Sequence, residues 1–403
     1  MDHAKRPKVG HVTGVFAVKA YMHSIYLDHA ATTPLDPQVL EAMLPYLQGN
    51  FGNPSSAHRM GRSARGAVEA SRERVAYHLN AQPKEIIFTS GGTEANNLAL
   101  RGTCTEGSLI CSAVEHEAVL QCAELLEQRG ICVHKLKPRA SGVVTGAQLE
   151  SALKDDTSLV SLVYVNNETG AVTPIRMISE VCRKTGIPFH TDAVQAAAYM
   201  PLDVDKLGVD LMSLSGHKIY GPKGVGVLYV RQGIDLKPMV RGGSQERGRR
   251  GGTENVAAIV GMAKALDRAR EQSASAAARI MALRHDLTCR LSAAFGDEIV
   301  INTPKNAAPH ILNLAFRSIG GTSLDGEMLL LNLDLEGIMA SAGSACSSGS
   351  LVPSHVLLAL GLDWETARTA LRFSLGRDST SDDIKVVAER LIHIVRRMRG
   401  ARA

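Results

Sequence analysis

Short apolar segments alternate with helical patterns through the middle of this chain, and this alternation limits the fold more than any other feature. The segments expected to be strands are 85–89, 108–112, 131–135, 159–165, 187–191, 210–214 and 225–230. The expected helices are 63–79, 93–101, 116–129, 146–154 and 174–185. This pattern predicts an α/β fold with a mostly parallel seven-stranded sheet and helices on both faces. Ligands of such sheets lie at the carboxyl ends of the strands, so the residues directly after each strand are the candidates for chemistry.

A long helical pattern over about 255–297 follows the alternating region. It predicts a connection from a large domain, 36–283, to a smaller α+β domain made of 25–35 and 284–403. Residues 1–24 lack the apolar core of a secretory signal, and we expect them to form a flexible extension.

Composition excludes several classes of protein. Hydrophobic residues make up 45% and charged residues 21% of the 403 residues, as in soluble globular proteins. No apolar run approaches the 18 residues of a membrane-spanning helix, so we expect no membrane partner. A net charge of +5 and only 4% aromatic residues are weak support for nucleic-acid binding, and we expect no nucleic-acid partner.

The seven cysteines form no CxxC pair, which argues against a zinc site and against a disulfide framework. Reduced thiols in the cytoplasm fit best. Six cysteines are expected to pack as small hydrophobic residues. Cys346 differs because it lies in the small-residue loop 341–350, where an exposed thiol beside a cation becomes a reactive thiolate. The alternative is an incidental loop cysteine.

Polar residues follow the first expected strands. Gly92 and Thr93 come after 85–89 at a helix start, where free N–H groups and the helix dipole favour a phosphate. A plain turn before a helix is the alternative. His116 comes after 108–112, and Asn167 comes after 159–165.

Two charged residues follow later strands. Asp192 could hold a cationic ring nitrogen, and no second carboxylate nearby supports a metal. Lys218, between Ser215, His217 and a Gly/Pro-rich turn, could form a Schiff base. A phosphate seat, a ring-nitrogen partner and an aldehyde partner are what pyridoxal 5′-phosphate needs.

Two further segments carry arginine. The loop 241–255 has the composition of an RGG-type RNA-binding segment, but it has no repeats. A second phosphate contact through Thr253, reaching across a dimer interface, is the better interpretation. Arg372, in a strand-like run, suits a substrate carboxylate, with a structural salt bridge as the alternative.

Ten ordered motifs between about residues 25 and 395 resemble the group I cysteine desulfurases, which are NifS/IscS-like and belong to the class V aminotransferases. These motifs are YLDHAATTP (26–34), FGNPSSAH (51–58), TSGGTEANNLA (89–99), EHEAV (115–119), NNETGA (166–171), HTDAVQA (190–196), SGHKIYGPKGVG (215–226), GGTEN (251–255), GSACSSGSLVPSHV (343–356) and RFSLG (372–376). The resemblance implies a homodimeric class V aminotransferase of fold type I with pyridoxal 5′-phosphate as its cofactor and no metal in the resting enzyme.

The resemblance also implies the roles of the site residues. Lys218 would hold the cofactor covalently, and His116 would stack on its ring and act as an acid/base. Asp192 would bind the ring N–H, and Gln195 the ring oxygen. The phosphate would be bound by Thr93, Ser215 and His217, with Thr253 supplied by the partner subunit, and by the cradle at Gly92. The substrate carboxylate would be held by Arg372 and by Asn167, which would also contact the cofactor, and Cys346 would take the sulfur.

The implied reaction converts L-cysteine to L-alanine and leaves a persulfide on Cys346. The sulfur then passes to an acceptor protein for iron–sulfur cluster assembly, tRNA thiolation or cofactor sulfuration. Three other interpretations stay open: a class V aminotransferase or selenocysteine lyase, a sulfur carrier without turnover, and a nucleic-acid binder. The short C-terminus puts one scaffold contact of housekeeping members in doubt and brings the chain nearer to specialised members.

Overall fold

The computed structural model describes residues 24–342 and 352–400. Two of the sequence-based predictions, the flexible extension over 1–24 and the reactive thiol of Cys346, concern residues that fall mostly or wholly outside these ranges.

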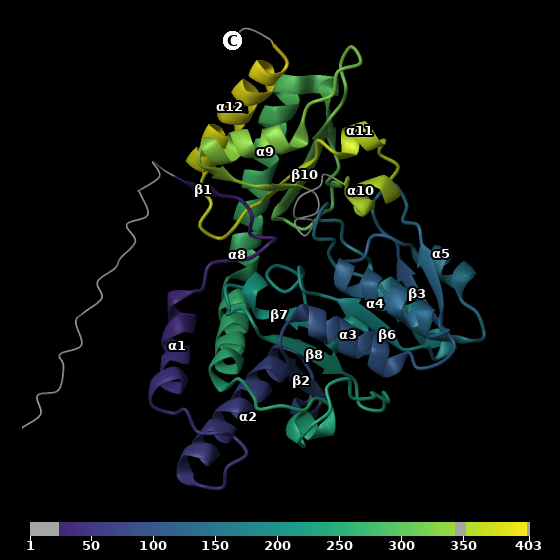
Figure 1. The fold of residues 1–403 in the computed structure, drawn as a ribbon, viewed down its shortest axis with the longest axis vertical. Coiled ribbons are helices and arrows are strands. Elements are labelled where there is room, and N and C mark those ends of the chain that lie inside the picture. The colour runs from purple at the N-terminus through teal and green to yellow at the C-terminus, as the bar shows by residue number, and fades with distance from the viewer. Residues whose placement is uncertain (1–23, 343–351, 401–403) are drawn as a thin grey trace, which may run out of the picture.

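A seven-stranded sheet forms the lower part of the molecule in Figure 1. Its strand order is β2-β8-β7-β6-β5-β3-β4. All neighbouring pairs are parallel except those of β8, which runs antiparallel to β2 and to β7. The strands are β2 (Ile86–Thr89), β3 (Ser108–Ser112), β4 (Cys132–Leu136), β5 (Thr157–Ser161), β6 (Phe189–Asp192), β7 (Leu211–Ser215) and β8 (Gly226–Val230).

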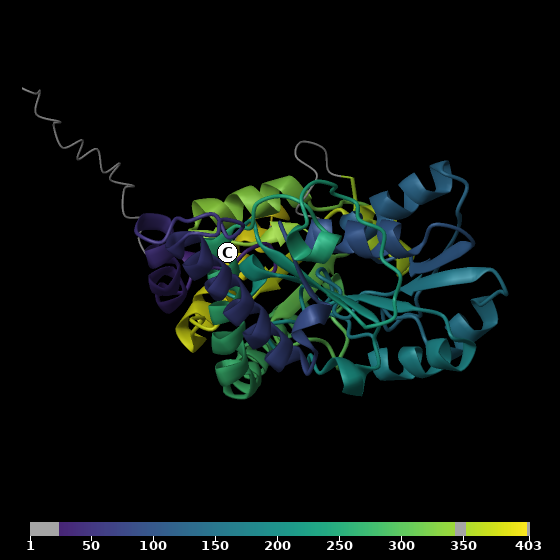
Figure 2. The ribbon, with the colours of Figure 1, turned by 90° about the horizontal axis from the view of Figure 1, so that it is seen from below.

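Helices cover both faces of this sheet (Figure 2) because both faces are apolar. Ile86 and Phe88 of β2 pack into one hydrophobic cluster, whereas Ile87 packs into another. The same alternation of period two continues along the other strands. One face carries α3 (Gly92–Thr103) and α4 (Glu117–Gln128). The opposite face carries α1 (Pro37–Gln48), α2 (Arg59–Leu79), α5 (Gly146–Ala152), α6 (Ile175–Thr185), α7 (Val204–Leu207) and the first half of α8 (Val256–Phe295).

A smaller four-stranded antiparallel sheet of order β12-β13-β10-β9 lies above the large one. Segments that are far apart in sequence meet beside it, since β1 pairs in parallel with β11 in a separate two-stranded sheet. The elements are β1 (Ile25–Tyr26), β9 (Ile299–Ile301), β10 (Ile311–Phe316), α9 (Gly326–Leu335), β11 (Ile338–Met339), β12 (Ser341–Ala342), α10 (His355–Ala359), α11 (Trp364–Ala367), β13 (Leu371–Ser374) and α12 (Ser381–Met398).

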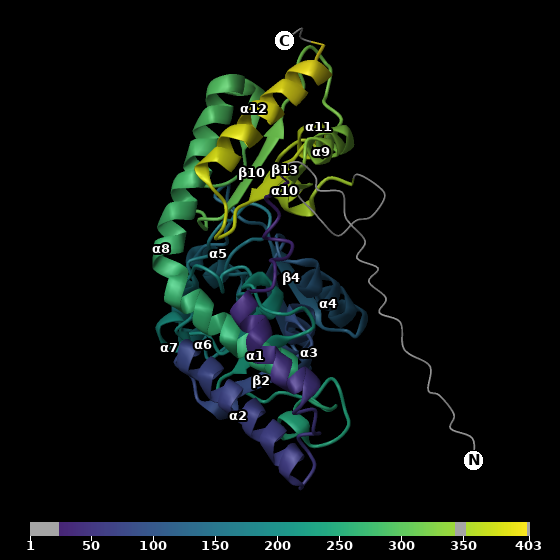
Figure 3. The same ribbon diagram turned by 90° about the vertical axis from the view of Figure 1, so that its left-hand side faces the viewer.

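Helix α8 runs along one side of both parts (Figure 3). Its residues up to Ala269 pack on the core of the large sheet, and those from Ala276 pack on a second core that contains Ile25 and Leu27. Two separate cores on one helix are compatible with the predicted domains, whose boundaries stay a prediction. No helix within 24–342 and 352–400 is long and apolar enough to cross a membrane.

The predicted mostly parallel seven-stranded sheet with helices on both faces is confirmed, with strand ends shifted by a few residues. The prediction that six cysteines pack as hydrophobic residues is wrong for two of them. Cys132 is exposed because β4 is the edge strand of the sheet, and Cys289 is exposed on the outer side of α8.

Candidate active site

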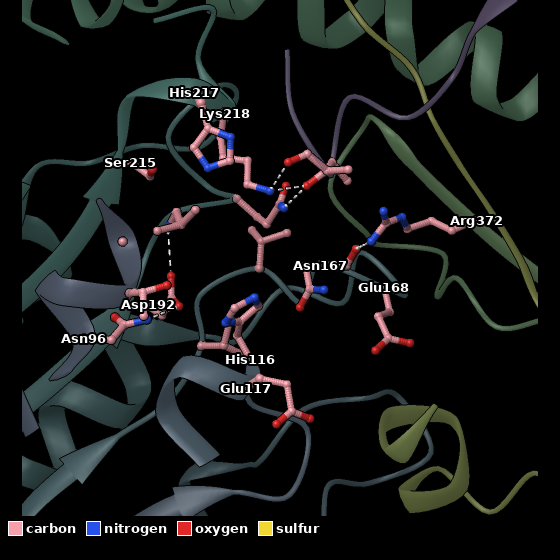
Figure 4. Close-up of a pocket in the computed structure, with 18 of the residues that line it drawn as sticks. Asn96, His116, Glu117, Asn167, Glu168, Asp192, Ser215, His217, Lys218 and Arg372 are labelled. Atoms are coloured by element: carbon pink, nitrogen blue, oxygen red, sulfur yellow. Dashed lines mark hydrogen bonds between the residues drawn. The ribbon is translucent and has the colours of Figure 1, made fainter. Parts of the chain in front are cut away.

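A cavity of about 440 Å³ opens where the carboxyl ends of β3, β5, β6 and β7 approach the small sheet (Figure 4). Ten of the residues predicted from the sequence line it together, although they come from distant parts of the chain. They are Gly92, Thr93, His116, Asn167, Asp192, Gln195, Ser215, His217, Lys218 and Arg372.

The N-terminus of α3 forms one wall of the cavity. The helix starts at Gly92 without a side-chain cap, so its first N–H groups point toward the cavity with the positive end of the helix dipole. A Cβ at position 92 would lie 2.7 Å from Val194 Cγ2, which is too close for any residue larger than glycine without displacement of Val194. The close approach of α3 to the end of β6 therefore favours glycine at this position.

Asp192 ends β6 with its carboxylate nearly buried. One oxygen accepts from the Asn96 amide at 2.6 Å, and the other accepts from the Val194 N–H at 2.9 Å. Asn96 was not predicted from the sequence, although it follows Thr93 by one helical turn. These two donors fix the orientation of the carboxylate.

Lys218 lies in a 3-10 turn directly after β7. Its ammonium donates to the carbonyl oxygens of Ala30 and Ala31 at 2.5 and 2.6 Å, as the dashed lines in Figure 4 show. The Gln195 amide donates to the same Ala30 oxygen at 2.7 Å. The loop after β1 thus holds the amine at the cavity and delivers two backbone acceptors to it.

His116 caps the N-terminus of α4 with its own side chain. Its Nδ1 accepts from the Ala118 N–H at 3.0 Å. Because Nδ1 is the acceptor, the ring carries its proton on Nε2 in this arrangement. The cap fixes the ring plane and leaves Nε2–H for a ligand in the cavity.

His217 and Ser215 lie beside Lys218 on the wall nearest the start of α3. Burial and the charges of Lys218 and Lys223 lower the pKa of His217 to about 4. The ring is therefore neutral at pH 7, and its Nδ1 lies 3.2 Å from the Thr32 hydroxyl. A neutral ring, a buried hydroxyl and a helix N-terminus together form a seat for an anion.

Arg372 reaches the cavity from the centre of the small sheet, where its side chain is buried. Its guanidinium donates to the Asn167 carbonyl at 3.0 Å and forms an ion pair with Asp28 at 2.9 Å. The four-stranded sheet thus supplies a fixed cation opposite Lys218, and this cation suits a carboxylate ligand.

Thr253 does not line this cavity within one chain. It lies in a separate hollow of about 200 Å³ with Arg250 and Asn255. Three arginines of loop 241–255 are used inside the chain: Arg250 pairs with Glu94 at 2.8 Å, Arg247 pairs with Glu69 at 3.6 Å, and Arg249 donates to the Lys84 carbonyl at 2.6 Å. The predicted supply of Thr253 by a partner subunit stays a prediction.

Two buried acids near the cavity were missed from the sequence. Glu168 lines the cavity, and burial raises its pKa to about 7 against the hydrogen bond from Ser354. Glu115, beside His116, is fully buried, and burial raises its pKa to about 8. His355 and Glu117 also line the cavity. Glu168 binds Ser354, 186 residues away, and Glu115 binds Val163, 48 residues away, so no local pattern indicates these contacts.

The residues that line the cavity fit pyridoxal 5′-phosphate. Gly92, favoured by close packing, opens the anion seat at the start of α3, and the oriented Asp192 carboxylate faces the same cavity as the Lys218 amine. No group of three or more potential metal ligands occurs in the part of the chain that the structure describes.

Comparisons with known proteins agree with this geometry. The family model described as aminotransferase class-V matches residues 25–387. The chain belongs to the class-V aminotransferase family. It is therefore an enzyme of a family that uses pyridoxal 5′-phosphate as its cofactor.

Curated relatives cover nearly the whole chain. The cysteine desulfurase IscS of Dictyoglomus turgidum is 45% identical over 381 residues, which is 93% of this chain and 95% of that protein. The cysteine desulfurase IscS of Methanosarcina thermophila is 43% identical over 94% of this chain and 93% of its own length.

Solved structures agree with the family. A NifS-like protein superposes with a TM-score of 0.85 and 35% identity, covering 93% of this chain and 99% of its own. A structure titled SspA in complex with cysteine gives a TM-score of 0.76 and 37% identity over 88% of this chain and 99% of that one. These likenesses confirm the predicted class V aminotransferase fold.

Proposed function

We propose that this protein is a pyridoxal-phosphate-dependent cysteine desulfurase that converts L-cysteine to L-alanine and moves the sulfur to Cys346. The observation that carries the proposal is one cavity with Lys218, Asp192, His116 and Arg372 on its walls, in a chain whose curated relatives are cysteine desulfurases. The structure titled SspA in complex with cysteine supports the substrate.

The residues of the cavity divide into three groups. Gly92, Thr93, Ser215 and His217 would bind the cofactor phosphate, Asp192 and Gln195 would bind its ring, and His116 would lie against that ring. Bound there, the cofactor withdraws electrons from the substrate and weakens the bonds at its α-carbon.

Substrate handling falls to other residues. Arg372 and Asn167 orient the carboxylate of L-cysteine, and the fork of a buried arginine favours two parallel hydrogen bonds to it. Lys218, which binds the cofactor, moves the proton at the substrate α-carbon. His116 offers Nε2–H as an acid.

Sulfur transfer requires a thiolate at Cys346. The thiolate attacks the substrate sulfur, a sulfur–sulfur bond forms as the carbon–sulfur bond breaks, and the electron pair stays with the carbon fragment. That fragment takes up a proton and leaves as L-alanine, so L-cysteine and the Cys346 thiol give L-alanine and the Cys346 persulfide. Ala342 of β12, four residues before Cys346, pairs with Leu371 next to Arg372, which supports this assignment.

The finer parts of the proposal concern partners. We propose a homodimer in which Thr253 of each subunit completes the phosphate site of the other, because Thr253 lies outside its own cavity. We also propose a cytoplasmic enzyme that delivers its persulfide sulfur to an acceptor protein, for iron–sulfur cluster assembly or another sulfur-containing product.

The test is product analysis. The purified holoenzyme is incubated with L-cysteine and a reducing thiol, and alanine and sulfide are quantified. Equal yields of the two products are expected. A cofactor-loaded enzyme that makes no alanine from L-cysteine contradicts the proposal, and turnover of L-selenocysteine alone favours a selenocysteine lyase instead.

A further inference from the structure

We propose that Glu168 is a positioning residue for the sulfur-transfer step. Through the hydroxyl of Ser354, its carboxyl group fastens the chain downstream of Cys346 to the wall of the active-site cavity. The inference rests on the proposed function, because it assigns a task to Glu168 within that reaction.

Hydrogen bonds of the Asn166 side chain hold the loop that carries Glu168 in place. Asn166 is buried, and its side-chain oxygen accepts from the backbone N–H groups of Glu168 and Thr169 at 3.0 and 2.9 Å. The Asn166 amide donates to the Val114 carbonyl at 2.9 Å and ties the loop to the segment before His116. Asn167 then lines the cavity, and the Glu168 side chain points toward α10 (Figure 4).

In the hydrogen bond between Ser354 and Glu168, the donor and the acceptor can be assigned. Ser354 caps α10, and its hydroxyl oxygen accepts from the N–H groups of Val356 and Leu357 at 3.1 and 3.3 Å. Its single O–H proton is thus left to donate to Glu168 Oε2, at 2.5 Å. Both side chains are buried, so no water replaces either partner if the other is lost.

His355, the residue after Ser354, attaches the start of α10 to the cavity wall a second time. His355 Nε2 lies 3.0 Å from the Glu115 carbonyl oxygen, and its Nδ1 lies 3.6 Å from the Glu117 carboxylate. The start of α10, whose N-cap Ser354 is eight residues after Cys346 in the sequence, is therefore attached both to the loop of Asn167 and to the loop of His116. An attachment at this place fixes the described chain just downstream of Cys346 against the wall of the cavity.

The charges around Glu168 make the attachment sensitive to pH. Arg372 of β13 favours the ionised carboxylate, as does the Ser354 hydroxyl, whereas burial and Glu117 of α4 oppose it. Burial dominates, and the pKa of Glu168 is raised to about 7. An ionised acceptor binds a hydroxyl more strongly than a neutral one. Sulfur transfer is therefore expected to speed up as pH rises through about 7.

The test separates sulfur transfer from cofactor chemistry. Holoenzyme is mixed with L-cysteine in single turnovers without added thiol, and two signals are followed: the absorbance change of the cofactor, and the persulfide of Cys346 by mass spectrometry. The variants are Glu168→Ala, Glu168→Gln and Ser354→Ala, with Glu365→Gln on the exposed side of α11 as the matched control.

We expect Glu168→Ala and Ser354→Ala to slow persulfide formation by about 10- to 100-fold, the effect of losing a hydrogen bond to a charged group. Their initial absorbance change should stay close to that of the wild type. Glu168→Gln, whose amide oxygen still accepts from Ser354, should retain most of the rate but lose the rise with pH near 7. Glu365→Gln should behave as the wild type.

Three results overturn the inference. One is persulfide formation at the wild-type rate in Glu168→Ala and Ser354→Ala, and another is an equal slowing of the absorbance change and of the transfer. The third is a Glu168→Gln enzyme that keeps the wild-type pH profile. A wild-type enzyme that forms no persulfide at all contradicts the proposed function itself, and the positioning role falls with it.

Discussion

Glu115 offers a quantitative test of the electrostatics beside the active site. The side chain is fully buried, and one carboxyl oxygen accepts from the Ser112 hydroxyl at 2.5 Å and from the Val163 N–H at 2.9 Å. The other oxygen has no hydrogen-bond partner in the described part of the chain. Burial and the nearby Asp192 charge raise the pKa of Glu115 from 4.5 to about 8, more than the two hydrogen bonds lower it.

The sign of the pH effect follows from this direction. The folded protein holds the proton of Glu115 at pH values where the unfolded chain has lost it. The contribution of Glu115 to the free energy of unfolding is thus fully present below about pH 4.5, and it is lost as pH rises toward 8. A rise of the pKa from 4.5 to about 8 corresponds to a contribution of roughly 5 kcal/mol.

The variant Glu115→Gln removes this pH dependence, because its amide does not ionise and its oxygen can still accept both hydrogen bonds. Urea unfolding of the holoenzyme at pH values between about 4 and 9 should show the variant gaining up to roughly 5 kcal/mol relative to the wild type as pH rises. Glu124→Gln, on the exposed side of α4, should show no such change. If the difference in the free energy of unfolding between Glu115→Gln and the wild type does not vary with pH, Glu115 is not protonated at neutral pH and the reasoning is refuted.

Three further substitutions test the cavity. Gly92→Ala places a Cβ 2.7 Å from Val194 Cγ2, and the displacement should weaken cofactor binding by about 10-fold or more in an absorbance titration, since overpacking costs about 1–3 kcal/mol. Asn96→Ala removes the 2.6 Å donor to the buried Asp192 and should lower cofactor affinity by about 10- to 100-fold; an unchanged affinity excludes that role. Arg372→Lys should raise KM for L-cysteine by about 10-fold or more because a lysine lacks the planar fork, and an unchanged KM places the substrate carboxylate elsewhere.

The sequence predicts the sheet well because its strands carry strong apolar signals. Lys218 follows the mostly apolar strand β7, and Asp192 follows the short apolar segment 187–189 that leads into β6. Because the carboxyl ends of such strands are where ligands bind, the sequence alone indicates both residues. The strand boundaries are less precise: the predicted strand 159–165 overlaps β5 (Thr157–Ser161) only at residues 159–161, and the chain then leaves the sheet toward Asn166.

Contacts between distant residues could not be read from the sequence. Ser354 and Glu168 are 186 residues apart, and neither flanking segment indicates the other. Asn96 is a different case, since its spacing of three residues from Thr93 places both on one side of α3 and could have suggested a role. Cys132 was misjudged because an apolar pattern does not tell an edge strand from a central one.

Transfer of sulfur to Cys346 is the central claim, and peptide mass spectrometry tests it most directly. Holoenzyme is treated with L-cysteine without added thiol, digested, and searched for peptides that have gained one sulfur atom. The account predicts the gain on the Cys346 peptide, with a matching amount of alanine, and no gain in a Cys346→Ala variant that still binds the cofactor. A wild-type Cys346 peptide without added sulfur, or the same sulfur on the exposed Cys132 or Cys289, contradicts it.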